Sequence, residues 1–362
     1  MDMKINFLPA KTWNWLRMNE TEVKQVKADR QALEKEEIPE TFAVEASTLE
    51  PIKTGMGPDM DKLAEQSGFA AKAYRMPAGR KEAAALRLGF VCKDQTASLD
   101  LIDLIAEENS EMTVVMDYAS DADAEGLCSV RTRAKVGKGA LLRLVQIDCL
   151  GKGFRVLNDV GSICEDQGRI EMVHIFLGGG KIYQGCRTEL LGNESSLQSD
   201  IGYLLQDDQR LDMNYVALHE GKRTNSEINA SGVLKDASSK LFRGTIDFQH
   251  GSAESVGAEK EDVLLMGDDV VNQTIPLILC AEEDVKGSHG ASIGQLDEET
   301  LFYMQARGIS EEQAYALMAD ARIEAVCQKI PDETAQKLVK AYLGLAMMTS
   351  VLVSPDGKYE YE

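Results

Sequence analysis

The sequence predicts a mainly β fold, and within that class it favours a β-solenoid. Between about residues 110 and 280, short runs rich in Val, Ile, Leu and Thr recur at roughly even spacing, and each run ends at Gly, Asn, Asp or Ser. About ten such strands fit a sandwich, a barrel or a solenoid. Small or polar corner residues favour the solenoid, because stacked coils need one apolar inward stripe and compact corners. The expected corners are residues 151–153, 178–180, 192–193, 207–208 and 267–269.

The first 75 residues precede this pattern and predict a small helical region. Residues 21–37 are rich in Lys, Glu, Ala and Gln, as is typical of a surface helix. Residues 59–67 place apolar residues at helical spacing and predict a second, short helix. Trp13 and Trp15 stand at the start of this region, where we expect them to anchor it to the body of the protein.

The β region alternates clearly in places, with Phe242, Ile246 and Phe248 on one face of an expected strand and Arg243 on the other. Pro276 lies in the last expected strand, which must therefore lie at a sheet edge or contain a bulge. Examples of the expected strands are residues 141–147, 155–164, 169–177, 181–191, 211–218, 240–248, 262–266 and 270–280.

Helices are expected again from residue 286 onward. Residues 297–307 are amphipathic, and Gly308 follows where a left-handed C-terminal cap belongs. Ser310 opens an S-x-x-Q capping box for a helix that continues to about residue 327, and a last helix spans residues 331–348. We therefore divide the chain into an N-terminal helical region (1–75), a β core (76–285) and a C-terminal helical domain (286–362).

The charge balance argues against two classes of partner. Lys and Arg number 39 against 60 Asp and Glu, which leaves a net charge of −21. Such a surface repels phosphate backbones and anionic lipid, so we expect no nucleic-acid and no membrane partner. No run approaches the roughly 18 apolar residues of a membrane span, and the first residues lack the apolar core of a signal peptide. We expect a soluble, cytoplasmic protein.

The cysteines and histidines give no local metal or disulfide motif. The seven cysteines are scattered and odd in number, and no CxxC pair occurs, so neither a disulfide framework nor a zinc site is predicted. The residues expected in the core are Cys128, Cys149, Cys164, His174 and His219, whereas His250 is expected on the surface beside a Gly-Ser corner.

Three stretches carry a family resemblance. Residues 284–297 are DVKGSHGASIGQLD, residues 301–310 are LFYMQARGIS, and residues 12–20 are TWNWLRMNE. They resemble the C-terminal and N-terminal hallmarks of the SufB/SufD family of iron–sulfur cluster assembly proteins. The resemblance implies a right-handed parallel β-helix flanked by N-terminal and C-terminal α-helical domains. It also implies a non-catalytic scaffold subunit, not an enzyme.

The resemblance further implies the partners. A SufC-type ATPase docks on the C-terminal helical domain, and a SufB-type paralogue or a second copy of the chain pairs through the end strands of the β-helix. The sequence contains no G-x-x-x-x-G-K-[ST] motif. The run Gly178-Gly179-Gly180-Lys181 lacks the leading glycine and the hydroxyl residue, so we expect no nucleotide bound by this chain and interpret the run as a corner.

The resemblance also suggests site residues. His289 matches a family histidine of SufD-type subunits that ligates metal in a transient iron–sulfur cluster shared at the subunit interface, where a partner cysteine would complete the site. The alternative is that His289 caps the turn before the helices. Glu261 falls where the SufB type has an essential cysteine, and Gly290 where it has an acidic residue. Cys186 lies two residues from Thr188, where an earlier SufB cysteine falls. His289, Glu261 and Cys186 are the candidate metal ligands. The differences from the SufB type at positions 261 and 290 favour a SufD-like chain.

Two alternatives remain at this point. One is a SufB-like homodimeric scaffold that works with a SufC-type ATPase alone. The other, more remote, is a carbohydrate-active β-helix enzyme, which needs a pair of acidic side chains as acid and base. Asp207, Asp208 and Asp212 could supply such a pair, although they fit turn positions better, and the absence of a secretion signal argues against this class.

Overall fold

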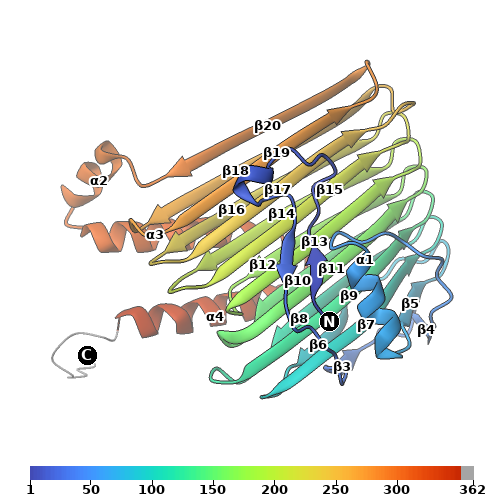
Figure 1. Cartoon of the computed structure of the whole chain (residues 1–362), viewed down its shortest axis with the longest axis horizontal. Coiled ribbons are helices and arrows are strands. Elements are labelled where there is room, and N and C mark those ends of the chain that lie inside the picture. The colour runs from blue at the N-terminus through green and yellow to red at the C-terminus, as the bar shows by residue number, and fades with distance from the viewer. Residues whose placement is uncertain (352–362) are drawn as a thin grey trace.

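The computed structural model describes the backbone of residues 1–351 and the side chains of residues 1–344. Its body is a parallel β-solenoid of about eight turns, which confirms the predicted fold class (Figure 1). Two nine-stranded sheets face each other, and from β5 onward consecutive strands alternate between them. We name the two sheets after their last strands, the β19 sheet and the β20 sheet.

The strands of each sheet stack in chain order, and each is parallel to the strand two places further on, except for the antiparallel β3 and β4. In spatial order the β19 sheet contains β4 (Ala43–Ala46), β5 (Lys72–Met76), β7 (Thr96–Ala106), β9 (Glu125–Val136), β11 (Gly153–Cys164), β13 (Lys181–Leu190), β15 (Arg210–His219), β17 (Ser239–Phe248) and β19 (Val271–Cys280). The β20 sheet contains β3 (Leu33–Glu37), β6 (Leu86–Val91), β8 (Glu111–Ala119), β10 (Leu141–Cys149), β12 (Arg169–Phe176), β14 (Ser196–Leu205), β16 (Asn225–Lys235), β18 (Ser255–Met266) and β20 (Val285–Gly294).

The predicted corners are confirmed, since they fall between successive strands, with Gly153 as the first residue of β11. Several corner residues adopt the left-handed backbone conformation, among them Asp207 with φ 54°, Asp236 with φ 56° and Gly179 with φ 71°. Aspartate and glycine tolerate this conformation better than branched residues do. The glycine run at 178–180 is thus a corner of the solenoid, as predicted.

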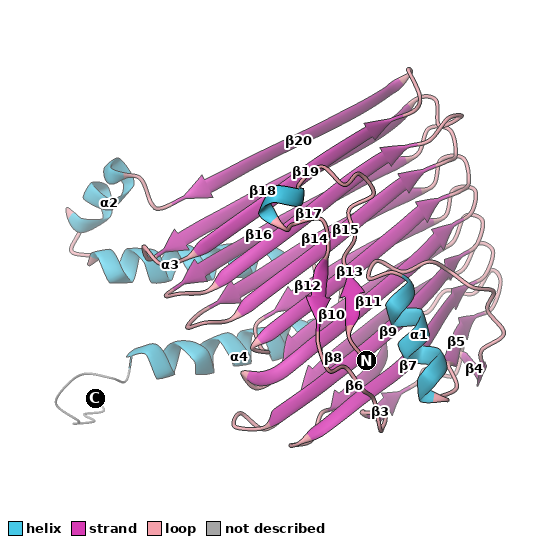
Figure 2. Ribbon diagram, in the orientation of Figure 1, coloured by secondary structure: helices cyan, strands magenta, loops and turns pink. Residues whose placement is uncertain are grey.

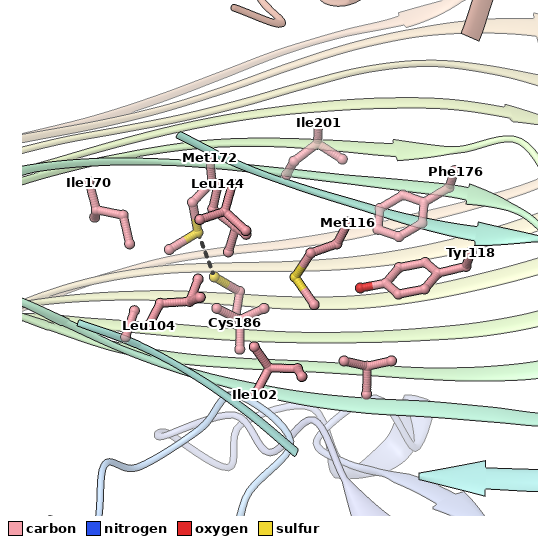
Figure 3. Close-up of a cluster of buried hydrophobic side chains, with 14 of the residues drawn as sticks. Ile102, Leu104, Met116, Tyr118, Leu144, Ile170, Met172, Phe176, Cys186 and Ile201 are labelled. Atoms are coloured by element: carbon pink, nitrogen blue, oxygen red, sulfur yellow. Dashed lines mark hydrogen bonds between the residues drawn. The ribbon is translucent and has the colours of Figure 1, made fainter. Parts of the chain in front are cut away.

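The core lies between the two sheets and is filled by the inward-facing side chains of each strand (Figure 3). Most are aliphatic or aromatic, but a row of hydrogen-bonded polar side chains also crosses the interior. Asn158 donates from Nδ2 to Gln146 Oε1 at 2.8 Å and to Gln184 Oε1 at 2.7 Å, and Gln146 Nε2 donates to Tyr118 Oη at 3.0 Å. Stacked coils bring such side chains together because each strand position repeats in the next coil.

The N-terminal region covers the outer face of the β19 sheet (Figure 2). The expected helix over residues 59–67 is confirmed as α1 (Pro58–Ser67). The expected helix over residues 21–37 is wrong: β2 (Thr21–Val23) pairs with β1 (Met3–Ile5), and β3 pairs antiparallel with β6. Free strand edges supply hydrogen bonds that outweigh the local helix propensity of this segment.

The two tryptophans do not anchor the N-terminal region. They lie at a short 3₁₀ turn, η1 (Asn14–Leu16), where Trp13 is 39% and Trp15 98% exposed, so that expectation is wrong. Leu8 and Met18 on either side of the turn make the attachment, because they pack against the outward-facing residues of β17 and β19.

The C-terminal helices are α2 (Glu298–Gln305), α3 (Glu311–Cys327) and α4 (Glu333–Val351). The predicted capping box at Ser310 is present, and Gly308 has the predicted left-handed conformation with φ 82°. Helices α3 and α4 bury side chains such as Val326 and Val339 against the outer face of the β20 sheet. Residues 352–362 of the predicted C-terminal domain lie outside the described part of the chain. Within the described part, no helix is long and apolar enough to cross a membrane.

Helices begin later than predicted, because β20 occupies residues 285–294. This strand has no apolar alternation, so its sequence does not resemble the other strands. It forms because β18 offers a free edge for parallel pairing, and it lengthens the solenoid by one strand beyond the expected last strand.

Candidate functional site

The last two strands leave two open sheet edges at the same end of the solenoid (Figure 1). Pro276 lies in β19, the terminal strand of its sheet, as its missing N–H group requires. In β20 the side chains between the two end residues are exposed. Strand edges with unpaired N–H and C=O groups are templates for pairing with another chain.

His289 lies in the middle of β20, so it does not cap a turn. Its register partner in β18 is Glu259. Partners in neighbouring parallel strands point to the same face of a sheet, and Glu259 is buried between the two sheets. His289 therefore stands on the inner face of the last strand, and it is exposed because no further coil covers it.

Glu261, two residues along β18, lies in a buried ion pair with Lys240 of β17. Lys240 Nζ also donates to Thr274 Oγ1 at 2.9 Å, and Thr274 Oγ1 donates to Glu261 Oε2 at 2.7 Å. Burial lowers the pKa of Lys240, and the Glu261 carboxylate opposes that effect. Glu261 thus already has two partners within the chain, which occupy both of its oxygens.

Glu259 is a buried carboxyl group without such partners. It is 5% exposed, and no hydrogen bond or ion pair reaches it within residues 1–344. It lies across from Gly244 of β17, where a Cβ atom would come within 2.2 Å of Glu259 Oε2. Burial, and secondly the nearby charge of Glu261, raise the pKa of Glu259 to about 8. The buried position therefore favours the protonated form of this carboxyl group.

The structure does not bring Cys186 to this end. Cys186 lies in β13, three strands from β19, and its side chain points into the core with Sγ 3.6 Å from Met172 Sδ (Figure 3). Burial raises the pKa of its thiol well above the usual value. Metal binding requires the thiolate, so this position favours packing over ligation in the folded chain.

A hollow of about 500 Å³ runs along the same edge, over β16, β18 and β20. Gly290 lines it, and nothing lies within 4 Å of the place where a Cβ atom would stand. The hollow is lined by Glu227, Asn229, Ala258, Glu259, Lys260, Glu261, Ser288, His289, Gly290, Ala291 and Ser292. The absence of a side chain at 290 leaves this face of the edge strand open.

No group of three or more His, Cys, Asp or Glu side chains in the described part of the chain is arranged to hold a metal ion. Of the three sequence-predicted ligands, His289 and Glu261 line the same hollow, although Glu261 is ion-paired with Lys240, and Cys186 lies apart in the core. A metal site at this edge would need ligands from a second chain.

Sequence reasoning missed Lys240, Glu259 and Thr274. One sequence signal was available for Glu259. Alternate residues of a strand share a face, so counting back from the apolar Val263 places residues 259 and 261 on the inward face of their strand. Two adjacent inward-facing acidic residues are unusual enough to mark a site. Lys240 and Thr274 could not be placed, because their proximity depends on strand register across about 30 residues of chain.

The other expected placements are mostly confirmed. His174 and His219 are buried, His250 is exposed, and Cys128 and Cys164 are in the core, with Cys149 partly buried. The acidic candidates for a carbohydrate-active enzyme do not form a pair. Asp207 is a corner residue as expected, whereas Asp212 is buried in β15 against Arg243.

The comparisons with known proteins concern most of the chain. Residues 90–322 match the family model of the SUF system FeS cluster assembly, SufBD core domain. Over 246 residues, or 67% of this chain, the sequence is 24% identical to the iron-sulfur cluster assembly protein SufD of Bacillus subtilis (strain 168), of which it covers 56%.

Two further relatives extend this picture. The SufD protein of Escherichia coli (strain K12) is 27% identical over 241 residues, which cover 66% of this chain and 56% of that protein. The iron-sulfur cluster assembly SufBD family protein ABCI8, chloroplastic, of Arabidopsis thaliana is 34% identical over 115 residues, 32% of this chain and 21% of the relative. The chain thus spans just over half the length of the two SufD proteins.

Proposed function

The chain belongs to the SufBD family of the SUF iron–sulfur cluster assembly system, and on this premise we propose that it is a SufD-type scaffold subunit rather than an enzyme. The observation that carries the proposal is the pair of open edges at β19 and β20, with His289 on the inner face of the outermost strand. A scaffold needs a surface for its partners and a ligand near that surface, and this end offers both.

We propose that a SufB-type paralogue pairs with these edges. Val271 on β19 and Ile293 on β20 are exposed apolar residues on the two terminal strands, and burying them would favour pairing. The chain's charge of −21 disfavours a second copy of itself as the partner. The iron–sulfur cluster is cargo that forms at this interface, where His289 would contribute one ligand.

We propose that a SufC-type ATPase docks on the C-terminal helices. Phe302 and Tyr303 of α2 are exposed, and Leu317 of α3 adds a third exposed apolar side chain. Exposed aromatic side chains on a helix are typical of a protein interface. The ATPase supplies the energy of nucleotide hydrolysis, which this chain transmits to the β-helix pair in the cytoplasm.

Two surface variants test both contacts at once. The chain carries a tag and is co-expressed with its SufB-type and SufC-type candidates, then purified without oxygen. Val271→Glu should lose the paralogue and keep the ATPase, because a charge enters the strand edge. Phe302→Glu should lose the ATPase and keep the paralogue.

Val256→Glu is the matched control, because Val256 is exposed to a similar degree (40% against 48% for Val271) but lies on β18, an interior strand. It should keep both partners. Recovery of the ATPase with two copies of this chain would replace the proposal by the homodimeric scaffold. Recovery of neither partner with the unaltered chain would overturn it.

A further inference from the structure

The short turn η1 and its flanking residues expose both tryptophans of the chain. Trp15 is 98% exposed, Leu16 57% and Trp13 39%. Large apolar side chains that gather on the surface of a soluble protein mark a site of interaction. Tryptophan is also enriched among the few residues that supply most of the binding energy of protein interfaces. This turn is therefore a candidate docking surface.

Internal hydrogen bonds hold the turn in one shape. The buried side chain of Asn19 accepts from the Trp13 backbone N–H at Oδ1, at 2.9 Å, and donates from Nδ2 to Asn14 Oδ1. Arg17 has the left-handed conformation, with φ 54°, and its N–H group donates to the Asn14 carbonyl at 3.2 Å. A preformed turn loses little conformational freedom when a partner covers it, so its exposed side chains are well prepared for binding.

The turn is fixed over the last two strands of the β19 sheet. Leu8 and Met18, on either side of it, pack against Leu241 of β17 and Ile275 of β19. Arg243 Nε donates to the Met18 carbonyl at 2.7 Å. Because β19 is the terminal strand of its sheet, the turn lies on the outer face of the sheet beside its open edge (Figure 2).

This position distinguishes between the two partners proposed above. Helices α3 and α4 cover the outer face of the β20 sheet, which is the opposite side of the solenoid from the turn. A strand that pairs with β19, in contrast, lies only about 4.8 Å beyond it. The chain that contributes this strand therefore comes up against the face on which the turn stands.

We infer that Trp15, together with Trp13 and Leu16, is a docking element for the SufB-type paralogue, which receives the indole in an apolar pocket beside its pairing strand. The inference rests on the proposed function, because it assigns side chains to the contact proposed for β19. Backbone pairing at a strand edge supplies affinity, and side chains in pockets supply specificity. Each buried tryptophan removes about 150–250 Å² of its surface from water.

Fluorine NMR of the full chain tests the contact directly. Incorporation of 5-fluorotryptophan gives two resonances, because the chain contains two tryptophans, and the Trp15→Phe variant assigns them. The shift of each resonance between H₂O and D₂O reports how far the indole is exposed to solvent. In the free chain, Trp15 should show the full shift of an exposed indole. Unlabelled paralogue should remove most of this shift, whereas the ATPase alone should leave it unchanged.

The dissociation constant for the paralogue, measured by sedimentation velocity, gives the energetic test. Trp15→Ala should raise it about tenfold or more. The thermal unfolding midpoint should not change, because a side chain that is 98% exposed makes little contact with the fold. Leu191→Ala is the control, because Leu191 is an exposed apolar residue at the end of β13, three strands from β19. It should leave the dissociation constant unaltered.

The outcomes separate this inference from the proposed function. A paralogue that binds the unaltered chain but leaves Trp15 exposed, with the same dissociation constant for Trp15→Ala, would overturn the inference and leave the proposed function intact. Protection of Trp15 by the ATPase alone, or by rising concentration of the chain alone, would also overturn it, because the turn would then serve another partner. Failure of the unaltered chain to bind the paralogue would overturn the proposed function, and this inference with it.

Discussion

Replacing Arg243 by methionine should detach the N-terminal segment from the solenoid. The guanidinium group of Arg243 donates to Asp212 Oδ1 at 2.6 Å, to the Met18 carbonyl at 2.7 Å and to Thr21 Oγ1 at 3.0 Å. Asn6 Nδ2 donates to the same Asp212 oxygen at 2.8 Å. The arginine and aspartate side chains are fully buried, so this one network joins residues 6–21 to β15 and β17.

The expected loss in the free energy of unfolding follows from the Asp212 charge that remains buried. Without Arg243, the Asp212 carboxylate stays buried with only the Asn6 amide and the Thr21 hydroxyl as donors. Removing one partner of a buried ion pair costs about 3–5 kcal/mol. We therefore expect Arg243→Met to lower the free energy of unfolding by about that amount. Amide hydrogen exchange should rise in residues 3–23, because this segment opens before the solenoid does.

Urea denaturation measures the loss, and Arg210→Met is the control because Arg210 is exposed on the neighbouring strand β15. The control should change stability by less than about 0.5 kcal/mol. The double variant Arg243→Met with Asp212→Leu should recover part of the loss, because no unpaired charge remains. The reasoning is refuted when Arg243→Met costs no more than Arg210→Met.

Three further predictions concern buried groups elsewhere in the solenoid. Burial raises the pKa of Asp148 to about 7, so the folded chain keeps a proton that the unfolded chain loses near pH 4. The stabilisation that comes from protonated Asp148 is complete below pH 4 and is lost as the pH rises through 7. Asp148→Asn should therefore reduce the fall in the free energy of unfolding between pH 5 and pH 8, as measured by urea denaturation. An unchanged fall would contradict the assignment. Gly55→Ala should lower stability by about 1–3 kcal/mol, since the new Cβ atom would lie 1.9 Å from the backbone nitrogen of Cys186. Thermal unfolding measures this loss. Gly290→Ala is the control and should be neutral, because its Cβ atom meets nothing within 4 Å. Lys240→Met should cost about 3–5 kcal/mol by leaving Glu261 buried and unpaired, and a loss below about 1 kcal/mol in urea would show that the pair is dispensable.

Local patterns were sufficient for the body of the fold. Alternation and corner residues predicted the coils because each strand buries one face, as in Phe242, Ile246 and Phe248 of β17. The Ser310 capping box and the Gly308 turn were equally readable, because capping depends on residues within four positions of each other. These features need no knowledge of distant parts of the chain.

The misplaced elements all depend on long-range pairing. Residues 21–37 have helix-forming composition but meet free strand edges, and β20 has no apolar pattern because no coil covers it. Trp15 looked like an anchor, but its neighbours Leu8 and Met18 make the contacts. At the candidate site, His289 could be named from its motif, whereas the partnership with Glu259 required the register of two strands 30 residues apart.

The central claim is that this chain is one member of an assembly built on its open β-helix end. Native mass spectrometry of the complex isolated without oxygen through a tag on this chain tests that claim most directly. The account predicts a particle that contains one copy of this chain, one SufB-type paralogue and the SufC-type ATPase. A particle with this chain alone, or with two copies of it and no paralogue, would contradict the account.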